Sequence, residues 1–199
     1  MKYIRFFSLI LLAVAGGCSR GFDYRISNSV FIEDTDNPGL PVYSEKGYNS
    51  FGVYWGLSLW TTQLPHDPSK VVIDNDSCHI HLSGSVGSNL HTLVISFPEY
   101  TPATFAELLS LNGKDFDLPG QECAISLLYG NRPMNLKILS GSFTVKRAQK
   151  MFIDKELESV VLSGTFSFKA TIDGVAETFS NGRFDMRFGN ENFYYLRKD

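Results

Sequence analysis

Two histidines have the spacing of a partial metal site. His79 and His81 are separated by one residue, so on a β-strand both side chains point to the same face, and His91 could lie on a neighbouring strand. A zinc ion needs three or four ligands. Because the residues that alternate with them from Cys78 to Leu82 are apolar, the histidines are also well explained as solvent-facing residues of a half-buried strand. No metal or other cofactor is therefore predicted, and His79 and His81 remain a weak alternative.

An aromatic segment is the main candidate for ligand contact. If residues 51–60 form one long strand, Tyr54 shares a face with Trp60 and stands between Gly52 and Gly56. A ring without taller neighbours can stack on a sugar or an apolar ligand. The alternative is that this face is covered by the other sheet or by a helix near residues 104–111, because aromatic residues in strands are usually packed. Tyr54 and Trp60 are the predicted ligand-binding residues.

The sequence contains no motif that predicts catalysis. No serine lies in a Gly-x-Ser-x-Gly turn between a strand and a helix. A pair of carboxylates for glycoside hydrolysis is defined by their separation in space, so a hydrolase on a β-sandwich stays an alternative. Many acidic residues, however, fall in turn-like segments, where carboxylates are ordinarily solvated. These are Asp34, Asp36, Asp74, Asp76 and Asp173. No catalytic residue is predicted.

The elements that would position these residues are mostly strands. From residue 160 to 172 apolar residues alternate with polar ones, which indicates a strand with one buried and one solvated face. Asp173-Gly174 predicts a tight hairpin turn that places Ile172 opposite Val175 and Phe168 opposite Phe179. A second turn is expected at Asn181-Gly182, followed by a strand with Phe184, Met186 and Phe188 pointing inward and Arg183, Asp185 and Arg187 pointing outward. The predicted fold is all-β with one short helix, a mostly antiparallel β-sandwich or flattened β-barrel of about eight to ten strands.

Further strands are expected at residues 91–97, 122–129, 136–145 and 193–197, and the helix after Thr101-Pro102. A short repeat occurs at Leu82-Ser-Gly, Leu139-Ser-Gly and Leu162-Ser-Gly, with the glycine on the apolar face of the strand. An inward glycine in a strand indicates curvature or room for a large side chain from the opposite sheet.

The amino terminus predicts the cellular location. Lys2 and Arg5 precede a ten-residue apolar run, Phe6 to Ala15, which is too short to span a ~30 Å bilayer core as a helix. Gly16-Gly17-Cys18 follows it, as in bacterial signal peptides that are cleaved before a lipid-modified cysteine. The expected organisation is a signal peptide (1–17), lipidated Cys18 with a tether leading into the fold (18–39), and one β-rich domain (40–199). Several acyl chains would anchor the protein stably to a bacterial membrane, with the outer membrane expected and the periplasmic or surface-exposed side left open.

The remaining cysteines, Cys78 and Cys123, could form a disulfide in an oxidising compartment. Both fall in strand-like segments where cysteine packs as a small hydrophobic residue, so two separate buried thiols are the alternative. The formal net charge is −3, and the sequence has no basic run. This composition argues against nucleic acid as a partner.

Three glycine-aromatic segments carry a resemblance to a known group of proteins: residues 40–52, Gly164 to Phe168 and Asn181 to Asp185. They resemble the small lipoproteins of unknown function that are common in Bacteroidota, over roughly residues 40–188. The resemblance implies a cell-envelope setting and no catalytic residues. We therefore expect a lipid-anchored envelope protein that binds a glycan, a lipid or a partner protein without catalysis, with a polysaccharide hydrolase or a purely structural protein as alternatives.

Overall fold

The computed structural model describes residues 29–62 and 69–196, and the predicted signal peptide, Cys18 and the first part of the tether lie outside them. The described residues form an all-β fold, as predicted, with twelve strands and two short 3-10 helices. The strands are β1 (Ser50–Trp55), β2 (Ser58–Thr61), β3 (Ser69–Asp74), β4 (Ser77–Val86), β5 (Asn89–Pro98), β6 (Lys114–Leu118), β7 (Ala124–Tyr129), β8 (Arg132–Pro133), β9 (Leu136–Ile153), β10 (Glu156–Ile172), β11 (Val175–Phe188) and β12 (Phe193–Leu196). The helices are η1 (Phe105–Leu111), where the sequence predicted one, and η2 (Asn190–Asn192).

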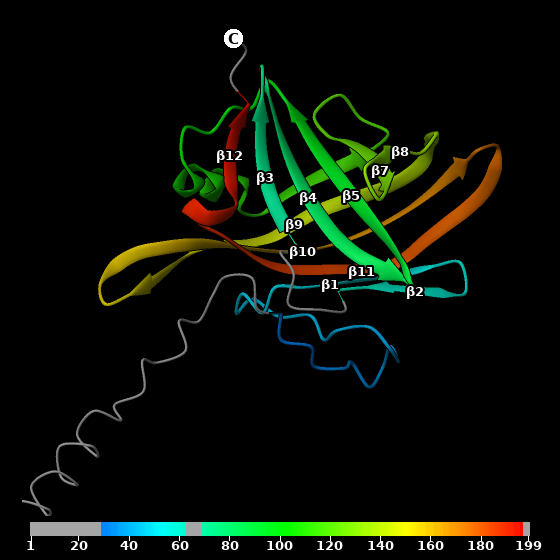
Figure 1. The fold of residues 1–199 in the computed structure, drawn as a ribbon, viewed down its shortest axis with the longest axis horizontal. Helices are drawn as coiled ribbons and strands as arrows, with labels where there is room; N and C mark the ends of the chain where they lie inside the picture. Colours follow the sequence, from blue (N-terminus) through cyan, green and yellow to red (C-terminus); the bar gives the residue numbers. More distant parts are fainter. Residues whose placement is uncertain (1–28, 63–68, 197–199) are drawn as a thin grey trace, which may run out of the picture.

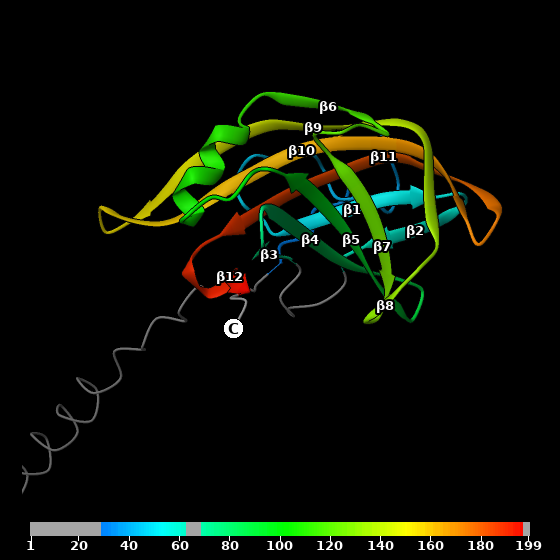
Figure 2. The ribbon, with the colours of Figure 1, turned by 90° about the horizontal axis from the view of Figure 1, so that it is seen from above.

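The strands form one hydrogen-bonded sheet that folds over itself into two layers (Figures 1 and 2). The first layer has the order β6-β9-β10-β11-β1-β2. Two residue pairs, Trp60 with Val86 and Thr61 with Ser85, connect β2 to β4 of the second layer, which continues through β5, β7 and β8. The other part of β4 pairs with β3, and β12 adds a parallel strand beside β3. The sheet does not close into a barrel in the described part of the chain.

The core fills the space between the two layers. Phe143 of the first layer stacks on Phe184 at 5.3 Å between ring centroids, and Phe97 of the second layer lies 6.2 Å from Phe143. Leu93 and Leu127 face the same core from β5 and β7. Burial of these rings and aliphatic side chains from both layers is the main stabilising contribution to the fold.

The predicted hairpin at Asp173-Gly174 is confirmed. Ile172 pairs with Val175 and Phe168 pairs with Phe179, and both turn residues have positive φ, 49° for Asp173 and 86° for Gly174. The turn type therefore fixes the register of the neighbouring strands β10 and β11.

The second turn predicted at Asn181-Gly182 is wrong. β11 runs without interruption from Val175 to Phe188, and Asn181, with φ of 54°, is an extra residue within it. Residues 180–181 stand opposite the single residue Ser167 of β10, which is a β-bulge. An Asn in the left-handed region suits a bulge as well as a turn, and the strands on both sides of β11 hold the bulge in place.

The strand predicted over residues 51–60 is a hairpin. β1 ends at Trp55, β2 begins at Ser58, and the fully exposed Leu57 with Gly56 forms the turn. Reversal of the chain pairs Val53 with Trp60 and Tyr54 with Leu59. Trp60 consequently shares the inward face of Val53 and not the face of Tyr54.

The outward face of β11 is not solvated as predicted. Phe184, Met186 and Phe188 are buried as expected, but Asp185 is only 1% exposed and Arg187 6%. Residues 29–49, here called the N-terminal strap, lie across this face of β10 and β11 (Figure 1). The strap is thus packed against the sheet along the described residues before β1.

Candidate functional site

The two aromatic residues predicted to bind ligand lie on different sides of the first layer. Trp60 is completely buried, with its ring edge-on to Phe51 at 5.0 Å. Its indole lies against Gly84, where a Cβ atom would come within 3.0 Å of Nε1 and within 2.7 Å of the Thr61 carbonyl oxygen, so this inward glycine allows close approach of both the indole and the backbone of β2. Trp60 is therefore unable to contact a ligand in the folded protein.

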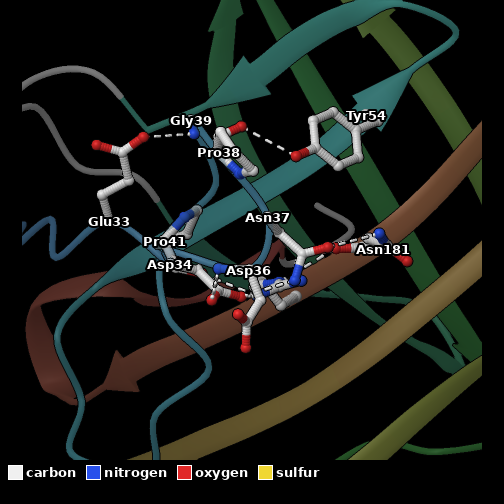
Figure 3. A network of polar contacts seen from close by, with 10 residues as sticks. Glu33, Asp34, Asp36, Asn37, Pro38, Gly39, Pro41, Tyr54 and Asn181 are labelled. Atoms are coloured by element: carbon white, nitrogen blue, oxygen red, sulfur yellow. Dashed lines mark hydrogen bonds and ion pairs between the residues drawn. The ribbon is translucent and has the colours of Figure 1, made fainter.

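Tyr54 faces outward but is held by the N-terminal strap (Figure 3). Its hydroxyl donates a hydrogen bond of 2.9 Å to the carbonyl oxygen of Pro38. Next to it, Gly39 lies so close to Leu59 that a Cβ atom would approach its side chain to 2.3 Å. The strap thus covers part of the surface that the sequence alone left open beside Tyr54.

A polar network ties the strap to β11 (Figure 3). Asn181 donates through Nδ2 to Oδ1 of Asn37 at 2.8 Å, and Arg183 forms an ion pair with Asp34. Hydrogen bonds from Asn37 and Arg183 lower the pKa of Asp34 below its usual value. Within the strap, Gly39 donates its N–H to Glu33 at 2.8 Å. The Asn181 bulge is therefore an attachment point of the strap.

Asp185 of β11 binds the part of the strap that leads into β1, residues 44–48. Its carboxylate accepts hydrogen bonds from the backbone N–H groups of Lys46 (3.2 Å), Gly47 (2.8 Å) and Tyr48 (3.1 Å), and from the hydroxyl groups of Ser44 (2.5 Å) and Ser163 (2.8 Å). Successive backbone N–H groups around a carboxylate form an anion-binding turn. Asp185 is used structurally here, and nothing in this arrangement leaves it available to a substrate.

The two cysteines are buried as separate thiols, and the disulfide that could have joined them is not formed. Cys78 pairs with Phe97 on β5, and Cys123 directly precedes Ala124, which pairs with Ser96 on the other edge of β5. The cysteines are thus two strands apart, roughly 9–10 Å by sheet spacing, which is beyond the reach of a disulfide. Burial raises the pKa of both thiols to about 12, so neither is a ready nucleophile.

The histidines do not form a metal centre. His79 and His81 face outward from β4, as predicted, while Cys78, Ile80 and Leu82 face the core. His91 lies on the opposite face of the sheet, edge-on to the ring of Trp55 at 5.2 Å. Among the residues that the structure describes, no group of three or more His, Cys, Asp or Glu side chains could hold a metal ion.

A groove of about 600 Å³ lies on the outer face of the second layer. Strands β3, β4, β5 and β7 form its floor, and β12 forms one wall. The residues that give the groove its chemistry are Lys70, His81, Ser83, Thr92, Leu128 and Tyr194. No acidic residue is among its described lining residues.

The groove combines an aromatic wall with a polar floor. Tyr194 is 45% exposed, and its hydroxyl donates to the carbonyl oxygen of Glu191 at 2.7 Å, which fixes the ring. On the floor, Ser83 and Thr92 pair across β4 and β5, and their hydroxyls lie 2.9 Å apart. His81, in register with Lys70, lies beside them. A groove that holds both an ordered aromatic ring and several donors and acceptors suits a ligand with a flat apolar face and hydroxyl groups.

His81 stays neutral under ordinary conditions. Burial, with smaller contributions from the positive charges of Lys70 and His79, lowers the pKa of His81 from 6.5 to about 4. Above about pH 5 its imidazole ring therefore offers one donor and one acceptor.

This pKa predicts how stability depends on pH. Because His81 binds a proton more weakly in the folded than in the unfolded protein, its contribution is fully present above pH 6.5 and is lost as the pH falls towards 4. We expect the free energy of unfolding to fall by about 2 kcal/mol more between pH 7.5 and 4.5 in the wild type than in His81→Gln, after allowance for solvent in the groove. Urea denaturation at both pH values measures the difference, and equal losses in both proteins would contradict the assignment.

Comparisons with known proteins provide no relative. Scans of protein-family models, of curated proteins and of solved structures found no match to this chain. Within the described residues, no helix is long and apolar enough to cross a membrane.

The groove was missed from the sequence for an identifiable reason. Tyr194 pairs with Val72, more than a hundred residues earlier in the chain, and only this parallel pairing brings β12 to the edge of the groove. The alternating polar residues of β4, among them His81 and Ser83, were visible in the sequence, but they indicated only a solvated face. The exposed aromatic cluster at the carboxyl terminus was the signal that could have drawn attention to this surface.

Proposed function

We propose that the protein is a lipid-anchored cell-envelope protein that binds a glycan in the groove beside β12, without catalysis. The anchor rests on the amino-terminal sequence ending in Cys18, and the envelope setting also on the resemblance to small Bacteroidota lipoproteins. The observation that supports glycan binding is that the fixed, half-exposed ring of Tyr194 and the hydroxyls of Ser83 and Thr92 line the same groove. Sugars present an apolar face and a hydroxyl edge, and the groove offers a partner for each.

The hydrolase alternative has weaker support. Glu99 and Glu122 both line a cavity of about 420 Å³ near η1, but both side chains are exposed. A general acid needs an environment that disfavours its ionised form, and a solvated carboxylate lacks one. The groove itself has no carboxylate among its described lining residues. Binding without hydrolysis therefore fits the structure better.

The glycan proposal predicts a specific loss of binding. In a glycan-array screen of the purified protein, Tyr194→Ala is expected to lower affinity for the bound glycan about 5- to 150-fold, because it removes roughly 1–3 kcal/mol of stacking and apolar contact. Tyr54→Ala is the matched control, since Tyr54 is a partly exposed tyrosine on the other layer, and it should leave binding unchanged. Loss of binding in Tyr54→Ala alone, or no glycan bound by the wild type, would contradict the proposal.

The anchor is tested separately. Intact-mass spectrometry of the native protein should show a chain that begins at Cys18 and carries acyl mass, and Cys18→Ser should remove that mass. A native chain without acyl mass would refute the lipid anchor. It would not bear on glycan binding in the groove, which the Tyr194→Ala experiment tests separately.

A further inference from the structure

A second cavity, of about 400 Å³, lies on the outer face of the first layer, next to the N-terminal strap. Tyr43 of the strap forms one wall. Ser142 and Lys146 of β9, Thr165 and Ser167 of β10, and Arg183 of β11 complete its main lining. The cavity exists in this form only because the strap is attached to the sheet, and it is separate from the groove beside β12.

The cavity is basic on a chain that is acidic overall. Lys146 and Arg183 line it, no acidic residue is among its described lining residues, and the formal net charge of the chain is −3. Arg183 forms an ion pair with Asp34, whereas Lys146 has no acidic partner within 4 Å among the described residues. The Lys146 ammonium lies 5.0 Å from the centroid of the Tyr43 ring. An excess of positive charge thus faces the cavity.

Its floor is made of hydroxyl groups. Ser142 pairs with Ser167 across β9 and β10, and Thr165 follows on the same face of β10. None of these three hydroxyls forms a hydrogen bond with another described residue, so all three are available to a ligand. A ligand that accepts hydrogen bonds at several points therefore suits this surface.

Two β-bulges border the cavity. In β9, Arg147 and Val145 pair with the consecutive residues Ser163 and Gly164 of β10, so Lys146 between them is the extra residue of a bulge. In β11, Asn181 is the extra residue of the other bulge. Bulges redirect the side chains next to them and are common beside functional sites. The first bulge contains Lys146 itself, and the second lies two positions before Arg183. Each bulge is therefore next to one of the two cations of the cavity.

From this arrangement we infer that the cavity binds an acidic sugar. Its carboxylate is held between Lys146 and Arg183, and its ring hydroxyls meet Ser142, Thr165 and Ser167. A neutral sugar leaves the Lys146 ammonium without an acidic partner, and a small inorganic anion leaves the hydroxyl floor unused. The site goes beyond the proposed groove and would let one protein hold two regions of a polysaccharide, or two polysaccharides, on opposite layers.

Titration calorimetry of the full chain with digalacturonate, with neutral digalactose and with inorganic sulfate tests this inference. We expect digalacturonate to bind at least tenfold more tightly than either control. Lys146→Gln should lower the affinity for digalacturonate at least tenfold, and Ser167→Ala should lower it a few-fold. Lys150→Gln is the matched control, because Lys150 is an exposed lysine of the same strand outside the cavity, and it should have no effect.

Three results would overturn the inference: no binding of digalacturonate, equal binding of digalactose or sulfate, or unchanged affinity in Lys146→Gln. Tyr194→Ala should leave digalacturonate binding intact, so failure of the groove and failure of this cavity are distinguishable.

Discussion

Asp185→Asn is expected to destabilise the protein by about 3 kcal/mol or more. The carboxylate is 1% exposed and accepts five hydrogen bonds, three of them from backbone N–H groups of the strap. Hydrogen bonds to a charged acceptor contribute roughly 1.5–3 kcal/mol each, though not additively. An amide at this position would turn an NH₂ group towards donors that need an acceptor, and those buried N–H groups would be left unpaired.

Urea denaturation measures the loss of stability, and limited proteolysis shows where it arises. Cleavage within residues 29–49 should become faster in Asp185→Asn, because the strap loses its main attachment to β11. Asp36→Asn is the matched control: Asp36 is an exposed strap carboxylate, and its replacement should change stability by no more than about 0.5 kcal/mol. A wild-type denaturation midpoint for Asp185→Asn would show that the hydrogen bonds around Asp185 do not hold the strap.

Trp60→Ala is expected to cost about 3–5 kcal/mol of stability, the range typical of removing a fully buried tryptophan. The ring is 0% exposed and contacts Phe51 and Trp55 at centroid distances of 5.0 and 5.9 Å. Gly84 leaves a space that only a large side chain fills, so the truncation creates a cavity between the layers.

The comparison with Leu57→Ala makes this result specific. Leu57 is in the same hairpin but fully exposed, and its replacement should alter the free energy of unfolding by less than about 0.5 kcal/mol. If Trp60→Ala instead kept wild-type stability and lost ligand binding, Trp60 would be a ligand contact, as the sequence suggested, and its role in core packing would be refuted.

Several features of the fold follow from local sequence. The alternation along β10 and the Asp173-Gly174 turn predicted the register of β10 with β11 correctly, since the turn fixes which residues face each other and the alternation fixes which face is buried. The inward glycine at position 84 was expected to mark curvature or room for a large side chain, and it allows close approach of both the Thr61 backbone and the Trp60 indole. In each case the pattern that carries the prediction lies within a single strand or turn.

Other features were decided by contacts between distant segments. The dipeptide Asn181-Gly182 permits a turn or a bulge, and pairing with β1 and β10 on both sides selects the bulge. Asp185 alternates with apolar residues along the strand, which predicts a solvated carboxylate. The strap buries it instead, although the strap lies some 140 residues earlier in the chain. The polarity of a strand face shows which groups need partners, but not whether water or protein supplies them.

The sequence by itself determined the all-β class, the positions of most strands and the hairpin between β10 and β11, because hydrophobic periodicity and turn residues act over short distances. Only the tertiary structure decided which aromatic residues reach the surface and where the cavities lie. Those depend on the reversal at Gly56-Leu57, on the parallel pairing of β12 with β3 and on the strap laid over β11. Each of these arrangements places side chains by contacts that no local pattern of residues encodes.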